Sequence, residues 1–288
     1  MTAVTPAPSF AETPSAVARR RFVVREGHPL LLANWERALF MHFELPPEVL
    51  QRHVPFELDL FEGRAFVSLV AFTMRGMRPA RGGPISRRLC ALLGEQRFLN
   101  VRTYARHHGE TGIYFLAEWI SHLLCVPFGP LTYGLPYRWG RHAFPHPGPH
   151  GTVRGRVESR RHGTALAYTA RLADGAKAWH FHIPVPGSLD EFLVERYTAF
   201  TQHGKRRRLF RIWHEPWRTS LAEMELLDDS LIQTQLPWWN EARFVGANYS
   251  PGAFDIWMGG GAGDHFSLSS TSPFHPSDGG SARNSSSL

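Results

Sequence analysis

The sequence predicts a mainly β domain of the α+β class. Three observations support this prediction. Apolar residues recur at alternate positions or in short continuous runs, turn sequences containing glycine separate these runs, and 20 Phe and 9 Trp supply bulky side chains for a large core. The 288 residues fit one such domain, because β barrels often reach about 250 residues as a single unit.

The first half of the chain predicts strands joined by tight turns. Residues 35–45 alternate between two faces, and Pro46-Pro47 opens a short helix, because proline is tolerated in a first turn. Residues 56–61 and 64–77 form a predicted hairpin, and the second stretch is apolar on both faces, which is typical of a central strand. Residues 98–119 predict another hairpin.

The second half continues this pattern and adds one helix. Ser188 with Glu191 three residues later matches a capping box, which predicts a helix over 189–201. Further strands are predicted over residues 153–159, 165–172, 178–185, 207–213 and 243–258. We expect a disordered basic arm over residues 1–22, one folded domain over 23–258 and a disordered Gly/Ser-rich tail over 259–288.

The net charge of +7 raises the question of nucleic-acid binding. Arg19–Arg21 and Lys205–Arg208 supply as many cations as the whole excess, so the charge is concentrated in the arm and beside one turn. We therefore expect nucleic acid not to be the partner. Cys90 and Cys125 lie in apolar surroundings, which favours free thiols in a reducing compartment. Since no stretch approaches the roughly 20 apolar residues of a membrane span, a soluble, cytoplasmic protein is expected.

Six short motifs resemble those of one protein family. They are Phe98 to Tyr104 (FLNVRTY), Gly112 to Phe115 (GIYF), Gly134 to Arg138 (GLPYR), Phe192 to Tyr197 (FLVERY), His214 to Trp217 (HEPW) and Asn248 to Pro251 (NYSP). In this order they resemble the YqjF-like family of uncharacterised bacterial proteins (DUF2071), which is similar to acetoacetate decarboxylase. The resemblance implies an antiparallel β cone or barrel with flanking helices and an internal cavity.

The chain departs from these relatives at two positions. Many family members carry Glu where this chain has Phe98, so an acid at that position is in doubt. Acetoacetate decarboxylases carry their Schiff-base lysine where Tyr137 stands here. Because a Schiff base needs a neutral amine, Tyr137 and the following Arg138 exclude that chemistry at this position. Lys177 and Lys205 lie in polar, turn-like settings typical of surface lysines.

One strand offers candidate ligand-binding residues. Alternation over residues 100–106 places Asn100, Arg102 and Tyr104 on one face, which the resemblance implies is the cavity face. On the return strand Glu118 is expected opposite Arg102. The pair is either a cross-strand ion pair that fixes register or part of a site in which Arg102 orients a carboxylate ligand.

Tyr137 and Arg138 are expected to help from the following turn, with Arg138 as a second anion-binding residue. His214 is the best candidate for proton transfer because imidazole titrates near neutral pH, although it could equally bridge backbone groups at a strand end. We therefore expect His214, Glu118 and Tyr137 to be the catalytic residues if the protein is an enzyme.

No metal or cofactor is expected. His180 and His182 share a strand face, and His142, His146 and His150 lie nearby in sequence, but no thiolate or carboxylate accompanies them at metal-ligand spacing. Three functions remain open at this point. The first is a pocket that binds an organic anion and performs lyase-like acid–base chemistry on a carboxylated or keto compound. The others are a non-catalytic ligand-binding module and a basic nucleic-acid-associated protein.

Overall fold

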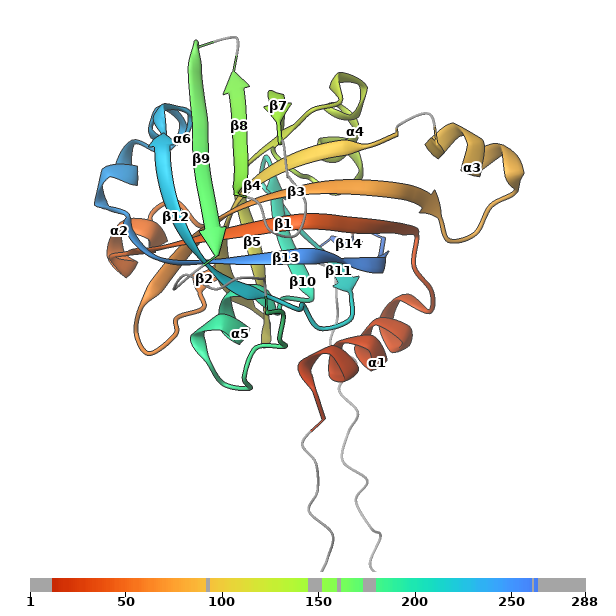
Figure 1. Ribbon diagram of the computed structural model, residues 1–288. Helices are drawn as coiled ribbons and strands as arrows, with labels where there is room; N and C mark the ends of the chain where they lie inside the picture. The colour runs from red at the N-terminus through yellow and green to blue at the C-terminus, as the bar shows by residue number, and fades with distance from the viewer. Residues whose placement is uncertain are drawn as a thin grey trace, which may run out of the picture.

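The computed structural model describes residues 12–91, 94–144, 152–159, 162–172, 180–260 and 262–263. Within these ranges, strands form one large sheet with helices at its margins (Figure 1). The strands are β1 Leu31–Leu45, β2 Glu57–Leu58, β3 Ala65–Pro79, β4 Gln96–His107, β5 Glu110–Ile120, β6 Tyr137–Trp139, β7 Arg141–Ala143, β8 Val153–Ser159, β9 Thr164–Leu172, β10 Thr198–His203, β11 Arg206–Trp213, β12 Ser220–Asp228, β13 Arg243–Met258 and β14 Ala262–Gly263.

Short helices connect and flank these strands, and the mainly β prediction is confirmed. They are α1 Pro14–Glu26, α2 Pro47–Gln51, α3 Pro84–Ala91, η1 Leu123–Cys125, α4 Phe128–Thr132, α5 Leu189–Val194, α6 Ser230–Gln235 and η3 Pro237–Glu241. Among the described residues, no helix is long and apolar enough to cross a membrane.

The strand order is β14-β11-β10-β5-β4-β3-β1-β13-β12-β9-β8-β7, with β2 beside β4 and β6 beside β5. The sheet is mixed, not purely antiparallel, because β5 pairs in parallel with both β10 and β6. Its curvature brings β11 back to β13, where Ile212 pairs with Met258 and Trp213 with Trp257. The seven strands from β11 to β13 therefore surround an interior.

The central strands β1, β3 and β4 have two buried faces. On one, which we call the packed face, Leu39, Leu69 and Leu99 belong to a continuous apolar core that includes Leu166 and Tyr168 of β9. On the other, the cavity face, apolar residues from the same strands pack toward α5, β10 and β11. The long apolar run predicted as a central strand is β3, which is buried on both faces.

The N-terminal segment corrects one prediction. Residues 14–22, expected to be part of a disordered arm, belong to α1, which begins after the N-cap Thr13. Phe22 is fully buried against Trp257, with 5.7 Å between ring centroids. The hydroxyl of Ser15 donates to the backbone oxygen of His214 at 2.7 Å. The helix thus covers the junction of β11 and β13.

The predicted helix over 189–201 is shorter than expected. Its N-cap is confirmed, since the Glu191 amide donates to the Ser188 hydroxyl at 3.2 Å, but the Glu191 carboxylate accepts from the amide of Gly187 instead of Ser188. The helix ends at Val194, and the β-favouring residues from Thr198 onward form β10. Of the strand predicted over 178–185, the described part makes one bridge, His182 to Thr219. Lys177, His146 and His150 lie outside the described residues, as does the tail from residue 264.

Candidate functional site

Alternation along β4 places its side chains on the two faces of the sheet. Leu99 and Val101 belong to the packed core, whereas Asn100 and Arg102 line a small internal cavity on the other face. This inner cavity has a volume of about 20 Å³, enough for about one water molecule. Its residues come from five strands, the end of α5 and the segments after α5 and β11, and they are Trp35, Ala38, Phe40, Val70, Phe72, Asn100, Arg102, Ile113, Phe115, Val194, Arg196, Ile212, His214 and Trp217.

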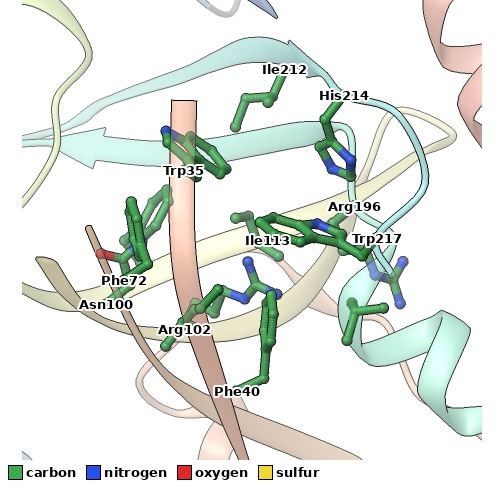
Figure 2. A pocket seen from close by; sticks show the side chains of 14 residues that line it. Trp35, Phe40, Phe72, Asn100, Arg102, Ile113, Arg196, Ile212, His214 and Trp217 are labelled. Carbon is green, nitrogen blue, oxygen red and sulfur yellow. The ribbon is translucent and has the colours of Figure 1, made fainter. Parts of the chain in front are cut away.

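Arg102 is the main charge in the inner cavity. Figure 2 shows its guanidinium group among the rings of Phe40 and Trp217. The residue is 7% exposed, one terminal nitrogen donates to the backbone oxygen of Leu193 at 3.1 Å, and Phe40 lies 5.5 Å from the guanidinium carbon. Its Nε finds no hydrogen-bond partner among the described residues. Burial lowers the pKa of Arg102, since removing the charge from water is unfavourable.

No carboxylate within the described part of the chain pairs with Arg102. The nearby Glu195 is engaged elsewhere, because it accepts from the hydroxyl of Tyr197 and, at 2.7 Å, from the amide of Trp217. Arg196 shows the contrast. Its side chain is 7% exposed, but it forms an ion pair at 2.8 Å with the buried Asp59, which also pairs with Arg106 at 2.7 Å. Of the two guanidinium groups at the inner cavity, one therefore has a carboxylate partner, and Arg102 has none among the described residues.

Arg196 was not singled out from the sequence, although it lies inside the FLVERY motif. Its Nε donates to the backbone oxygen of Phe192 at 2.8 Å, and one terminal nitrogen has no partner among the described residues. Burial lowers the pKa of Arg196, while Asp59 acts in the opposite direction. An arginine just after the end of a helix could have indicated this position. The helix was predicted to continue through residue 201, so Arg196 was placed inside it.

His214 lines the inner cavity, and Figure 2 shows its ring directed toward Trp217. Its Nδ1 lies 2.8 Å from the backbone oxygen of Glu215 and therefore donates, so in the neutral ring Nε2 carries the lone pair. Tyr197 stacks on the ring at 4.6 Å. The imidazole thus combines the two roles considered from the sequence: it bonds the backbone at the end of β11, and it is presented to the cavity.

Tyr104 follows Arg102 by two residues on β4 and does not line the inner cavity. Its hydroxyl donates to the backbone oxygen of Leu193 at 2.7 Å and lies 2.6 Å from the hydroxyl of Ser68. Ser68 in turn lies 2.7 Å from Nδ1 of His42, whose Nε2 lies 3.1 Å from the side-chain oxygen of Asn248. Burial, and secondarily the charge of Arg102, lower the pKa of His42 to about 3. This neutral chain fixes Tyr104, which shares the Leu193 oxygen with Arg102.

The predicted pairing of Arg102 with Glu118 is wrong. The β4–β5 register is Asn100 to Glu118 and Arg102 to Phe115, with a bulge between them at which Leu116 of β5 is extra. A bulge reverses the alternation of the strand that carries it. Glu118 therefore shares the face of Phe115, where Tyr137 of β6 is its pairing partner.

Glu118 and Tyr137 are neighbouring acidic groups, the first buried and the second partly buried. Glu118 is 3% exposed, and its Oε2 has no partner among the described residues. Burial raises the pKa of Glu118 well above its usual range. Burial and the neighbouring Glu118 also raise the pKa of Tyr137. Both shifts favour the protonated form of each group, in which it can donate a proton.

Tyr137 lines a second, larger recess, which we call the outer pocket. It has a volume of about 400 Å³ and opens to solvent beside Leu30, which is 51% exposed. Phe98 lines it too, so the residue that replaces the family glutamate forms an apolar wall. The described residues that line it are Leu30, Leu31, Met74, Met77, Cys90, Gln96, Phe98, Cys125, Gly129, Thr132, Tyr133 and Tyr137.

Arg138 does not join the site. Because side chains alternate along β6, Arg138 points away from Tyr137, lies over the ring of Trp119 on the packed face and donates to the side-chain oxygen of Gln235. It lines neither the inner cavity nor the outer pocket. The structure thus brings Asn100, Arg102 and His214 together, places Glu118 and Tyr137 beside them, and separates Arg138.

The described residues contain no group of three or more His, Cys, Asp or Glu side chains suited to a metal ion. His142 is buried, its Nδ1 donates to the backbone oxygen of Gly140 at 2.9 Å, and burial lowers its pKa to about 4.

Comparison with solved structures places this fold among acetoacetate decarboxylase-like proteins. Acetoacetate decarboxylase from Legionella pneumophila superposes with a TM-score of 0.54 at 14% identity, covering 90% of this chain and 93% of that chain. An acetoacetate decarboxylase-like enzyme from Sphingomonas wittichii RW1 gives 0.54 at 17% identity, covering 82% and 93%. The enduracididine biosynthesis enzyme MppR, complexed with pyruvate, gives 0.54 at 14% identity, covering 82% and 90%.

Sequence comparison is more specific. The uncharacterized protein YqjF of Bacillus subtilis (strain 168) is 28% identical over 221 residues, which cover 72% of this chain and 82% of that protein. The model of the DUF2071 family, described as an uncharacterized conserved protein, matches residues 32–249. These residues include all the side chains that line the inner cavity, and on this evidence the chain belongs to the DUF2071 family.

Proposed function

We propose that this protein binds a small organic anion, a carboxylate in the first instance, at Arg102 in the inner cavity. The observation that carries the proposal is a buried guanidinium group that faces an aromatic cavity with an unused N–H and without a carboxylate partner in the described chain. A buried charge is costly unless it is paired. A bound carboxylate would supply the missing partner and accept two charge-assisted hydrogen bonds.

The fold relatives support the class of ligand. One of them, MppR, has been solved with pyruvate, a small keto acid. The inner cavity in this conformation holds about one water molecule, so a carboxylate enters only when neighbouring side chains move. Of the residues that line the inner cavity and the outer pocket, none is lysine, and Lys205 is exposed in the turn after β10. Binding without a Schiff base is the chemistry these residues favour.

Proton transfer is the catalytic option that the site offers. The Nε2 of His214 could accept a proton from a ligand held at Arg102, and the protonated Glu118 or Tyr137 could donate one. Such a set suits lyase-like acid–base chemistry on a keto or carboxylated compound. Without a substrate that turns over, the same residues make a binding module, and product formation followed by NMR distinguishes the two.

The test is thermal stabilisation by carboxylates. A carboxylate at about 100 times its dissociation constant stabilises the fold by about 2.7 kcal/mol, which corresponds to a melting shift of about 5 to 11 °C for a domain of this size. We expect Arg102→Met to abolish the shift and Arg138→Ala to keep it. Lack of any shift across a panel of keto and carboxylic acids, or an equal shift in Arg102→Met, would contradict the proposal. Borohydride treatment with pyruvate should leave the protein mass unchanged.

A further inference from the structure

The inner cavity and the outer pocket lie in series along the same strands. On β4, Gln96 and Phe98 line the outer pocket, and the next two residues of that face, Asn100 and Arg102, line the inner cavity. Strand β3 follows the same order, with Met77 and Met74 in the outer pocket, then Phe72 and Val70 in the inner cavity, and on β1 the order is Leu31, then Trp35. Three neighbouring strands therefore each contribute residues to one chamber and then to the other.

A stacked aromatic pair separates the chambers. Phe72 and Phe98 are cross-strand partners whose rings lie 5.0 Å apart at 7°, and one ring lines each chamber. Trp35 lies 5.3 Å from Phe72 on the inner side. This aromatic pair therefore lies at the boundary between the two chambers. Four residues of extended strand, about 13 Å, separate Phe98 from Arg102.

The two chambers differ in chemistry. The outer pocket, with a volume of about 400 Å³, lies within the usual range for small-molecule sites, about 300 to 1,000 Å³, and its walls are mostly apolar. The elements around it also expose apolar side chains: Ile85 on α3 is 75% exposed, Leu124 on η1 68% and Leu131 on α4 75%. The inner cavity contributes the guanidinium of Arg102, which has no carboxylate partner among the described residues.

We propose that the two chambers are halves of one site for an amphiphilic monocarboxylic acid, such as a medium-chain fatty acid. Its carboxylate binds Arg102 and its apolar body fills the outer pocket once Phe72 and Phe98 rotate. This inference rests on the proposed anion binding at Arg102 and adds the apolar body. A keto acid as small as pyruvate would leave the outer pocket empty.

The experiment is a chain-length series of butanoate, hexanoate, octanoate and decanoate, followed by calorimetry below the concentrations at which these acids form micelles. Burial of each added methylene should tighten binding about fourfold, the factor that corresponds to about 0.8 kcal/mol. Arg102→Met should abolish binding of the whole series.

Cys90→Trp, which directs an indole from α3 toward the outer pocket, should weaken decanoate to the level of butanoate and leave butanoate unchanged. Ile85→Trp on the exposed face of the same helix is the matched control and should behave as the unmodified protein.

The native thiols give a readout without substitution. The chain has two cysteines, and both line the outer pocket. Decanoate at ten times its dissociation constant should slow their reaction with a thiol reagent about tenfold, since about one molecule in eleven remains free. Butanoate at the same saturation should not slow it.

The outcomes separate the two proposals. If short acids bind through Arg102 but affinity does not grow with chain length, the single site is refuted and anion binding at Arg102 stands. If long acids bind equally well to Arg102→Met, the outer pocket binds apolar compounds by itself and the single site is again refuted. If no acid binds, both proposals fall.

Discussion

The two faces of β1, β3 and β4 are equally buried but differ in what they enclose. On the packed face, Leu39, Leu69 and Leu99 meet other apolar side chains without exposure to solvent. On the cavity face the same strands carry Arg102 and His42, both buried, beside two recesses. Groups that are costly to bury are concentrated on one side of a shared backbone. The apolar packing of the packed face thus stabilises the sheet. This stability allows the cavity face to hold charged and titratable groups that are unfavourable to bury.

The largest effect should follow from opening the packed face. Leu69→Ala removes a fully buried side chain and leaves a cavity, so the free energy of unfolding should fall by about 2 to 5 kcal/mol. Urea denaturation measures this change. Binding of carboxylates by the remaining folded protein should not change, and a loss of affinity comparable to that of Arg102→Met would show that the two faces are not independent.

The next largest effect should come from His42 on the cavity face, which should make the free energy of unfolding depend on pH. His42 is neutral when folded, with a pKa lowered to about 3, but it protonates near pH 6.5 when unfolded. Its contribution is complete above pH 6.5 and is lost as pH falls toward 3, by about 1.4 kcal/mol for each pH unit. His42→Gln should flatten denaturation midpoints measured over this window. An unchanged slope would mean that His42 is already charged in the folded protein.

Substitution of Arg102 should change the free energy of unfolding in the opposite direction to Leu69→Ala. Because its charge is buried without a carboxylate partner, Arg102→Met should raise the stability of the unliganded protein by about 1 to 3 kcal/mol while it abolishes anion binding. Denaturant melts without ligand provide the measurement. Destabilisation would indicate that Arg102 serves the fold and not a ligand.

The smallest effect at acidic pH is expected at Glu118, which Gln replaces with the same shape. Since burial raises the pKa of Glu118, the folded protein holds a proton that the unfolded chain releases above about pH 4.5. The wild type should therefore lose stability relative to Glu118→Gln as pH rises above that value, and the two should converge below it. Paired denaturation curves at pH 4 and pH 8 test this sign.

Much of the difference between the packed face and the cavity face could be predicted from the sequence, because the alternation of side chains along a strand is a local property. The strand order around the 98–119 hairpin, the apolar run of β3 and the shared face of Asn100 and Arg102 all follow from residue period. The position of Glu118 could not be predicted, since a bulge leaves no clear pattern in the apolar residues around Leu116.

The other misses also have non-local causes. Residues 14–22 looked disordered because their composition is polar and basic, yet α1 is stabilised by Phe22 against a tryptophan more than 200 residues away. Strand β10 was assigned to a helix because capping fixes where a helix begins and says little about where it ends. The outer pocket was not predicted, since it is assembled from four separate stretches of chain.

The extra residue at Leu116 lets β5 vary in length without changing the face of its later side chains. Phe115 and Glu118 share the cavity face because the bulge absorbs one of the three steps between them. Deletion of Leu116 would leave Ala117 alone between them, so regular alternation would keep Glu118 on the same face, beside Tyr137. Pairing Leu116 into the ladder without a deletion would instead turn Glu118 to the packed face, so the position of this acid depends on the bulge and not on the number of residues in β5.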